Sequence, residues 1–163
     1  MFTSVILGAG KSTRMKANKS KLLFNIAGKP VINHIVSSLK NAKAKHNICV
    51  INNSSAELKK ILEAEKVSFA YQKILDGTAG AVKAALKSKT NSNSKLLILC
   101  GDIPFITSSS IKKLVAKLRN HDAVVGTVEL ESPKGYGRIV RVNNKFSSIV
   151  EENETTPEQR QIR

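Results

Sequence analysis

The sequence lacks tryptophan, and only 4% of its 163 residues are aromatic. Surfaces that hold single-stranded nucleic acid commonly stack bases on aromatic side chains, so this shortage argues against such a surface. Cysteine is also scarce: Cys49 and Cys100 form no spacing pattern, which excludes a disulfide scaffold and a cysteine-based zinc site. Each lies in an apolar run typical of a strand, which predicts that both thiols are small core residues.

Long apolar runs are missing as well. None approaches the roughly 18 residues of a membrane span, and the opening residues, 1–4, carry no basic leader typical of a signal peptide. Hydrophobic residues nevertheless make up 41% of the chain, which is enough to build a core. We therefore expect one globular domain, cytoplasmic and without a membrane partner.

Acidic residues are few. Twelve Asp and Glu oppose 27 Lys and Arg, giving a formal net charge of +15. Such a charge is found in nucleic-acid-binding proteins, but here the lysines are spread along the chain rather than gathered in one block. The spread favours a solvated lysine surface over a nucleic-acid partner, and the charge should attract nucleotides and other anions.

The most informative segment follows the first apolar run, Ser4 to Leu7. It reads Gly8-Ala9-Gly10 and is followed by the cations Lys11, Arg14 and Lys21. Glycines without Cβ atoms let the backbone turn tightly and bring N–H groups close to a ligand. A strand, a glycine turn and fixed positive charge together predict a polyphosphate-binding loop.

Two familiar phosphate loops do not fit this segment. A Walker A loop requires a glycine five residues before the Gly-Lys-Ser step, but Val5 stands there. A dinucleotide fingerprint requires a third glycine, where this chain has Thr13, and an acid about 20 residues on. The first acid in the chain is Glu57, so the loop is neither of these.

Apolar runs and amphipathic stretches alternate along the rest of the chain. The pattern predicts strands over 4–7, 46–51, 67–71, 95–100, 123–130, 138–142 and 146–150, an extended segment over 22–26, and helices from 31 onward and over 54–65, 78–87 and 108–119. This order predicts an α/β fold: a Rossmann-like, doubly wound, mostly parallel sheet with helices on both faces. The run over 95–100 is apolar on both faces and predicts a fully buried strand. Residues 1–150 would form the domain, and 151–163 a polar tail.

Ligands in such folds bind beyond the carboxyl ends of the strands. That rule brings the glycine loop together with Gly101-Asp102, which directly follows the strand over 95–100. A carboxylate beside a phosphate-binding loop is suited to hold Mg²⁺. The alternative is an aspartate that caps an ordinary turn before Pro104.

Two further segments have both a functional and a structural interpretation. Gln72, followed by Gly77-Thr78, places an amide near the start of a helix, where it suits the donor and acceptor edge of a pyrimidine. Gly-Thr before a helix is also a common cap. The segment Gly135-Tyr136-Gly137-Arg138 is compatible with simple turn chemistry.

Together these motifs resemble the sugar nucleotidyltransferases, of the MobA-like NTP transferase family. The signature of that family corresponds here to Leu7 through Met15 and then Ser20-Lys21. The Gln72 to Thr78 spacing, Gly101-Asp102-Ile103-Pro104 and Gly135 to Ile139 resemble the uridyltransferase domain of N-acetylglucosamine-1-phosphate uridyltransferases. The resemblance runs from about Ser4 to the final residue.

The resemblance implies transfer of UMP from UTP to N-acetylglucosamine 1-phosphate, with Mg²⁺ as cofactor. It implies catalytic roles for Arg14 and Lys21, a metal ligand in Asp102, and sugar binding by Gly137 and Glu151. The implied nucleotide-binding residues are Leu7, Gly8, Ala9, Gly10, Lys11, Gln72, Gly77 and Thr78.

The chain departs from the family at Ser12, Ser20, Leu75 and Cys100. Family members also continue further, with another sugar-binding Asn, a second Mg²⁺ ligand and a β-helix acetyltransferase domain, so a complementing polypeptide or an oligomer is a possible partner. Three interpretations therefore stay open: an active uridylyltransferase, a catalytically impaired nucleotide-binding remnant of one, and a basic nucleic-acid-binding protein.

Overall fold

The computed structural model describes residues 1–10, 20–52, 56–88 and 95–163. The predicted loop cations Lys11 and Arg14 and the predicted helix cap at Ser54-Ser55 lie outside the described residues. The chain divides into two compact units, Met1–Val124 (unit 1) and Val125–Arg163 (unit 2). The domain boundary expected after residue 150 falls inside unit 2.

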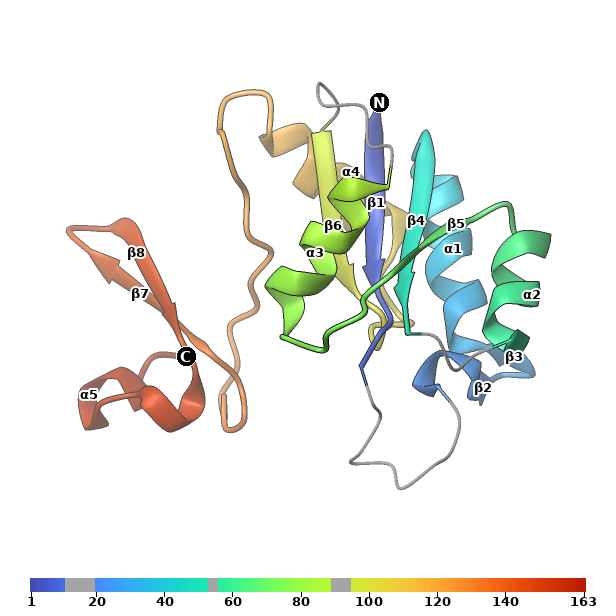
Figure 1. The fold of residues 1–163 in the computed structure, drawn as a ribbon. Coiled ribbons are helices and arrows are strands. Elements are labelled where there is room, and N and C mark those ends of the chain that lie inside the picture. Colours follow the sequence, from blue (N-terminus) through green and yellow to red (C-terminus); the bar gives the residue numbers. More distant parts are fainter. Residues whose placement is uncertain (11–19, 53–55, 89–94) are drawn as a thin grey trace. The chain divides into compact units, whose positions relative to one another are not determined.

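Unit 1 is built on a sheet of four parallel strands in the order β5-β4-β1-β6 (Figure 1). These are β1 (Phe2–Leu7), β4 (His46–Ile51), β5 (Ser68–Tyr71) and β6 (Lys95–Cys100). The central strand β1 places Leu7 beside Val50 on one side and Cys100 on the other. The loops after β1 and β6 therefore leave the same edge of the sheet.

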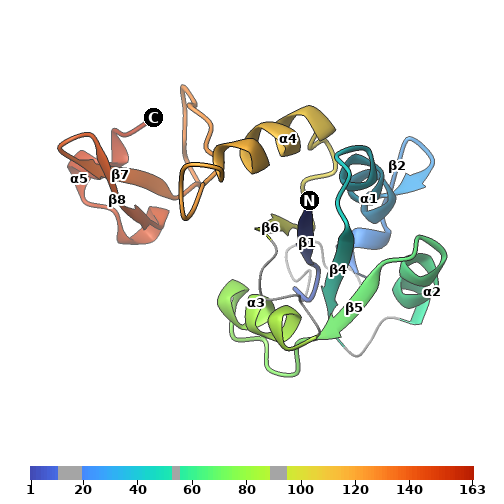
Figure 2. The ribbon, with the colours of Figure 1, turned by 90° about the horizontal axis from the view of Figure 1, so that it is seen from above.

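Helices cover both faces of this sheet (Figure 2). On one face lie α1 (Val31–Asn41), α2 (Ala56–Ala64) and α4 (Ser108–Lys117), and on the other lies α3 (Thr78–Lys87). Side chains alternate along β1, so Ile6 packs with the first group and Val5 with α3. The doubly wound α/β fold predicted from the sequence is confirmed.

A short irregular segment joins the first loop to α1. The 3₁₀ helix η2 (Lys21–Leu23) is followed by a small hairpin of β2 (Asn25–Ile26) and β3 (Lys29–Pro30). The prediction of an extended segment over 22–26 is therefore wrong for its first half. Among the described residues, no helix combines the length and apolar character needed to cross a bilayer.

Two strand predictions need correction. The strand over 95–100 is not buried on both faces: Leu97 and Leu99 are buried, whereas Ile98 is 45% exposed and Cys100 is exposed. Its position as the edge strand β6 explains this, because only one of its faces is covered. Residues 123–130 form no strand, because no described strand hydrogen-bonds with them.

Unit 2 consists of an antiparallel hairpin, β7 (Arg138–Val142) and β8 (Lys145–Val150), followed by the 3₁₀ helix η3 (Glu152–Glu154) and the short helix α5 (Pro157–Arg160). Asn143 and Asn144 link the strands with positive φ at both positions, as a tight hairpin requires. A capping box between Thr156 and Gln159 starts α5. Residues 151–163, predicted from the sequence as a polar tail, thus contain both of these short helices.

Candidate active site

The first part of the site is formed where β1 and β6 end. The Gly8 N–H donates to the Val50 carbonyl at 2.9 Å, and the Gly101 N–H donates to the Leu7 carbonyl at 3.0 Å. A Cβ on Gly8 would lie 2.6 Å from Leu22 Cδ1, and one on Gly101 would lie 2.7 Å from Leu22 Cδ2. Both glycines are therefore needed, because the fully buried Leu22 and a backbone carbonyl, that of Val50 or of Leu7, lie close to each Cβ position.

This packing positions the residue before Leu22. Lys21 Nζ donates to Asp102 Oδ2 at 2.6 Å, although the two residues are 81 positions apart in sequence. The side chains are 27% and 54% exposed, respectively, so the pair lies at the protein surface and is reachable by a ligand. The structure thus places the predicted phosphate-binding cation and the predicted metal ligand in direct contact.

The donor set around Asp102 is small. Among the described residues, no group of three or more His, Cys, Asp or Glu side chains gathers where it could hold a metal ion. Mg²⁺ is commonly held by one or two carboxylates together with substrate phosphates. Asp102, half-exposed and lining a cavity, fits a Mg²⁺ ion that arrives with a nucleotide rather than one held in a cage of protein ligands.

A cavity of about 530 Å³ opens beside this ion pair. Of the predicted site residues, Leu7, Ala9, Gly10, Lys21, Gln72, Gly77, Thr78 and Asp102 line it. Its volume lies in the range of small-molecule sites. The structure therefore brings the glycine loop, the Gln72 to Thr78 segment and the ion pair around one space. Gly8 does not line this cavity, but its lack of a side chain leaves room for Leu22.

The Gln72 side chain is held firmly at one wall of this cavity. Its backbone N–H donates to the Ile51 carbonyl at 3.0 Å just after β5, and the residue is only 8% exposed. Gln72 Nε2 donates to Asp76 Oδ1 at 2.9 Å and to the Gly77 carbonyl at 3.0 Å. Gly77, with φ of 93°, then precedes the first turn of α3.

Sequence reasoning missed three residues that line the cavity: Leu75, Ala81 and Cys100. The prediction that Cys100 is a core residue is wrong, because the last residue of an edge strand faces the ligand side. Burial and the nearby Asp102 charge raise the pKa of the Cys100 thiol, and the Lys21 charge partly offsets them. Its position directly before Gly101-Asp102 was the available signal.

Within unit 2, the two predicted sugar-binding residues lie together. A Cβ on Gly137 would lie 3.8 Å from Glu151 Oε2 and 3.2 Å from Ile149 Cγ2. Gly137 also lines a separate cavity of about 160 Å³, together with Tyr136 and Arg138. The absence of a side chain at position 137 keeps the backbone accessible beside the Glu151 carboxylate.

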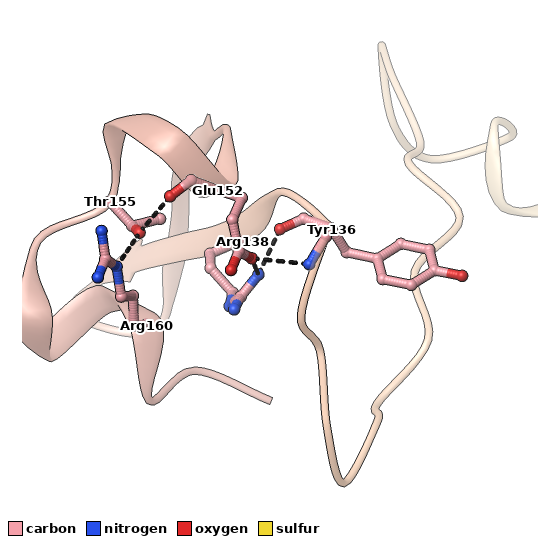
Figure 3. A network of polar contacts seen from close by, with 6 residues as sticks. Tyr136, Arg138, Glu152, Thr155 and Arg160 are labelled. Atoms are coloured by element: carbon pink, nitrogen blue, oxygen red, sulfur yellow. Dashed lines mark hydrogen bonds and ion pairs between the residues drawn. The ribbon is translucent and has the colours of Figure 1, made fainter. Parts of the chain in front are cut away.

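A polar network fixes the turn that carries Gly137 (Figure 3). Glu152 Oε2 accepts from the Gly135 N–H at 3.0 Å and from Arg138 Nη1 at 3.0 Å, and Arg138 also donates to the Tyr136 carbonyl. The Gly135 N–H, and after it the buried Arg138 guanidinium, hold the pKa of Glu152 below its usual range. Sequence reasoning did not identify Glu152, because the family motif draws attention to the preceding acid.

The far side of this network ties the chain end to the hairpin. Thr155 Oγ1 donates to the Glu152 carbonyl at 2.7 Å, and Arg160 Nε donates to Thr155 Oγ1 at 3.1 Å. Thr155 is buried. Residues 151–160 thereby support the turn at 135–137 instead of forming a free tail.

Known proteins share both the sequence and the fold. The chain is 38% identical over 165 residues to the bifunctional protein GlmU of Caldicellulosiruptor saccharolyticus, covering 99% of this chain and 36% of that protein. It is 35% identical over 159 residues to GlmU of Buchnera aphidicola subsp. Acyrthosiphon pisum, covering 98% and 34%. The chain thus spans about a third of the length of these curated relatives.

Solved structures give the same picture. HddC from Yersinia pseudotuberculosis is 25% identical with a TM-score of 0.76, covering 93% of this chain and 69% of that one. A nucleotidyl transferase from Methanothermobacter thermautotroptrophicus has a TM-score of 0.57 at 18% identity, covering 71% of this chain and 57% of that one. The MobA-like NTP transferase domain matches residues 4–146, and the chain belongs to this family.

Proposed function

We propose that the chain is a sugar-phosphate nucleotidyltransferase that transfers UMP from UTP to N-acetylglucosamine 1-phosphate. The observation that carries this proposal is the Lys21–Asp102 pair at a cavity lined by the glycine loop and the Gln72 to Thr78 segment. The similarity to GlmU proteins supports the choice of substrates. The nucleotidyltransferase region corresponds to residues 1–150.

In this reaction a phosphate oxygen of the sugar phosphate attacks the α-phosphorus of UTP. The bond between the α-phosphorus and the bridging oxygen to the β-phosphate breaks, and pyrophosphate leaves with the electron pair. The protein contributes mainly by positioning and by neutralising charge. No residue needs to form a covalent intermediate.

Each proposed role follows from the charge and position of the side chain. Lys21 stabilises negative charge that builds on the α-phosphate, and Arg14 holds the leaving phosphates. Asp102 would hold Mg²⁺, which supplies positive charge to the phosphate oxygens when bound. Gln72, Gly77 and Thr78 bind the base and ribose side of the nucleotide.

The residues that we propose to bind the sugar, Gly137 and Glu151, both belong to unit 2. The Glu151 carboxylate accepts hydrogen bonds from sugar hydroxyls, and Gly137 offers its backbone without a side chain in the way. Their proximity in the structure supports a shared role.

The test is pyrophosphate release from UTP and N-acetylglucosamine 1-phosphate with Mg²⁺. We expect turnover, and a loss of about 100-fold or more in Lys21→Ala, as when one charge-stabilising donor is removed from an active site. Lys29→Ala, which removes an equal charge from an exposed position in β3, serves as the matched control. Equal activity of wild type and Lys21→Ala contradicts the assignment.

A second candidate function is nucleotide binding without turnover. It is favoured by the small donor set for a metal, because Asp102 belongs to no group of three or more His, Cys, Asp or Glu side chains among the described residues. A folded chain that binds UTP and releases no pyrophosphate would establish this function. A complementing polypeptide or a second copy of the chain would then be the partner to seek.

A further inference from the structure

The orientation of the Gln72 amide decides which group it offers to a ligand. A side-chain amide has two N–H donors on Nε2 and one carbonyl acceptor, Oε1. Both donors of Gln72 are engaged, one by Asp76 Oδ1 and one by the Gly77 carbonyl. What remains for a ligand in the cavity is the Oε1 acceptor.

This orientation is enforced by the chemistry of the two partners. A backbone carbonyl and an ionised carboxylate can only accept hydrogen bonds. Rotating the amide by half a turn would set Oε1 against two acceptors and leave all three groups unpaired. Asp76 and Gly77 therefore lock the amide with its donors turned toward themselves.

Gln72 Oε1 is left open to the cavity. It accepts no hydrogen bond within the described parts of the chain, yet it is not among the buried polar atoms that lack a partner. It is therefore accessible, and the residue that carries it lines the cavity. The N–H of Gly77, another residue that lines the cavity, has no acceptor among the described residues.

The position of Asp76 depends on a glycine in the neighbouring helix. A Cβ on Gly80 would lie 1.6 Å from Asp76 Oδ1 and 2.3 Å from Asp76 Cγ. The carboxylate thus occupies the space over the first turn of α3 that any side chain at position 80 would fill. Asp76 and Gly80 form a matched pair that holds the amide in place.

We propose that Asp76 is a positioning residue that sets the base selectivity of this cavity by fixing Gln72 Oε1 as an acceptor. A fixed acceptor suits a base with a hydrogen on its ring nitrogen beside a carbonyl, as in uracil and thymine. Cytosine carries a lone pair on the same ring nitrogen, which Oε1 repels. The proposal rests on the proposed function, in that the cavity receives the base of a nucleotide.

The experiment compares equilibrium binding of UTP and CTP, with Mg²⁺ and without sugar phosphate, so that no turnover is needed. The variants are Asp76→Leu, which frees the amide to rotate, and Gly80→Ala, which displaces the carboxylate while keeping Asp76. Alanine is favoured over glycine inside a helix, so the second variant should stay folded. Circular dichroism confirms the fold of each protein.

We expect wild type to prefer UTP, and both variants to lose about 10-fold of that preference, the size of one hydrogen bond. Asp76→Asn should keep most of it, because its amide oxygen can still accept from Gln72 Nε2. Asp122→Asn removes the same charge at an exposed position away from the cavity and should leave the preference unchanged.

An unchanged UTP preference in folded Asp76→Leu and Gly80→Ala overturns the role of Asp76. Nucleotide binding with the expected loss of preference, but no pyrophosphate release, supports that role and contradicts only the proposed activity. Absence of any nucleotide binding overturns both. A merely structural role for Asp76 would change melting temperature and leave the ratio of the two affinities intact.

Discussion

At the scale of single residues, the site depends on contacts that contribute little to the stability of the fold but fix the positions of side chains. The Lys21–Asp102 pair is half-exposed, and pairs of this kind contribute only about 0–1 kcal/mol. Loss of Lys21 should therefore lower activity without unfolding the chain. The two cysteines likewise differ in how exposed they are, and this difference should decide how each one reacts.

We predict that a thiol reagent modifies Cys100 and spares Cys49 in the folded protein. Cys100 is exposed, whereas burial raises the pKa of the Cys49 thiol to about 12, so Cys49 forms almost no thiolate. The raised pKa of Cys100 means that its labelling should be slow near neutral pH and accelerate as pH rises. Mass spectrometry of the labelled peptides measures both rates.

Protection by nucleotide completes this test. Because Cys100 lines the same cavity as Lys21 and Gln72, saturating UTP should slow its labelling. Cys100→Ala supplies the control in which no native labelling occurs. Rapid labelling of Cys49 in the native protein would contradict the burial of that thiol.

The sequence predicted which residues gather at the cavity better than it predicted the residues that hold them in place. The glycine loop and Asp102 follow from motif and position, since the ends of parallel strands share one edge. Leu22 and Asp76 act through contacts with residues distant in sequence or through a side chain folded back over a helix. Nothing in local composition indicates such contacts, so only the structure could show them.

At the scale of elements, the turn at 135–137 is held by the Glu152 carboxylate. The depressed pKa of Glu152 means that its charged form is favoured by folding. The stabilisation is therefore complete above the ordinary glutamate value of about 4.5, and is lost as pH falls through the lower, folded value.

We predict that Glu152→Gln weakens protection of the Gly135 amide at neutral pH, since an ionised acceptor is lost and the buried Arg138 is left without its ionic partner. The difference from wild type should shrink once pH falls below about 4.5. Hydrogen exchange of the Gly135 N–H, measured by NMR at several pH values, gives the protection of this amide in the variant and in wild type. Glu154→Gln, in the same 3₁₀ helix and exposed, is the control, and equal exchange in both variants would refute this role.

Elements with their own periodicity were predicted with near-correct bounds, as for α3 and β4. The errors concern elements whose state depends on neighbours. Residues 123–130 have the composition of a strand, but a strand requires a hydrogen-bonded partner. Residues 151–163 are polar, and their order comes from a capping box and the Thr155 contacts.

At the scale of the whole molecule, the formal charge of +15 acts on every anionic ligand. We predict that UTP affinity falls several-fold between 50 and 300 mM NaCl, because salt screens exposed charges. A nucleic-acid-binding protein would lose affinity for DNA or RNA much more steeply with salt. Titrations of UTP and of a short DNA duplex across the same salt range separate the two interpretations.

For a nucleotidyltransferase, UTP should remain bound at salt concentrations that release the duplex, and excess duplex should not compete with UTP. Strong duplex binding with no preference for UTP would instead favour the nucleic-acid interpretation. The net charge alone does not distinguish these outcomes, because it indicates that the ligand is anionic but not whether it is a nucleotide or a nucleic acid.

The packing of Leu22 against Gly8 and Gly101 has an evolutionary consequence. A side chain at either glycine would meet a methyl group of Leu22, and it would also meet a backbone carbonyl: that of Val50, 2.9 Å from the Cβ position of Gly8, or that of Leu7, 2.7 Å from the Cβ position of Gly101. Substitutions at these three sites are therefore epistatic: their effects depend on the order in which they arise. Because Leu22 contacts both positions, a change at residue 22 alters the room at both glycines at once and couples the loops that follow β1 and β6.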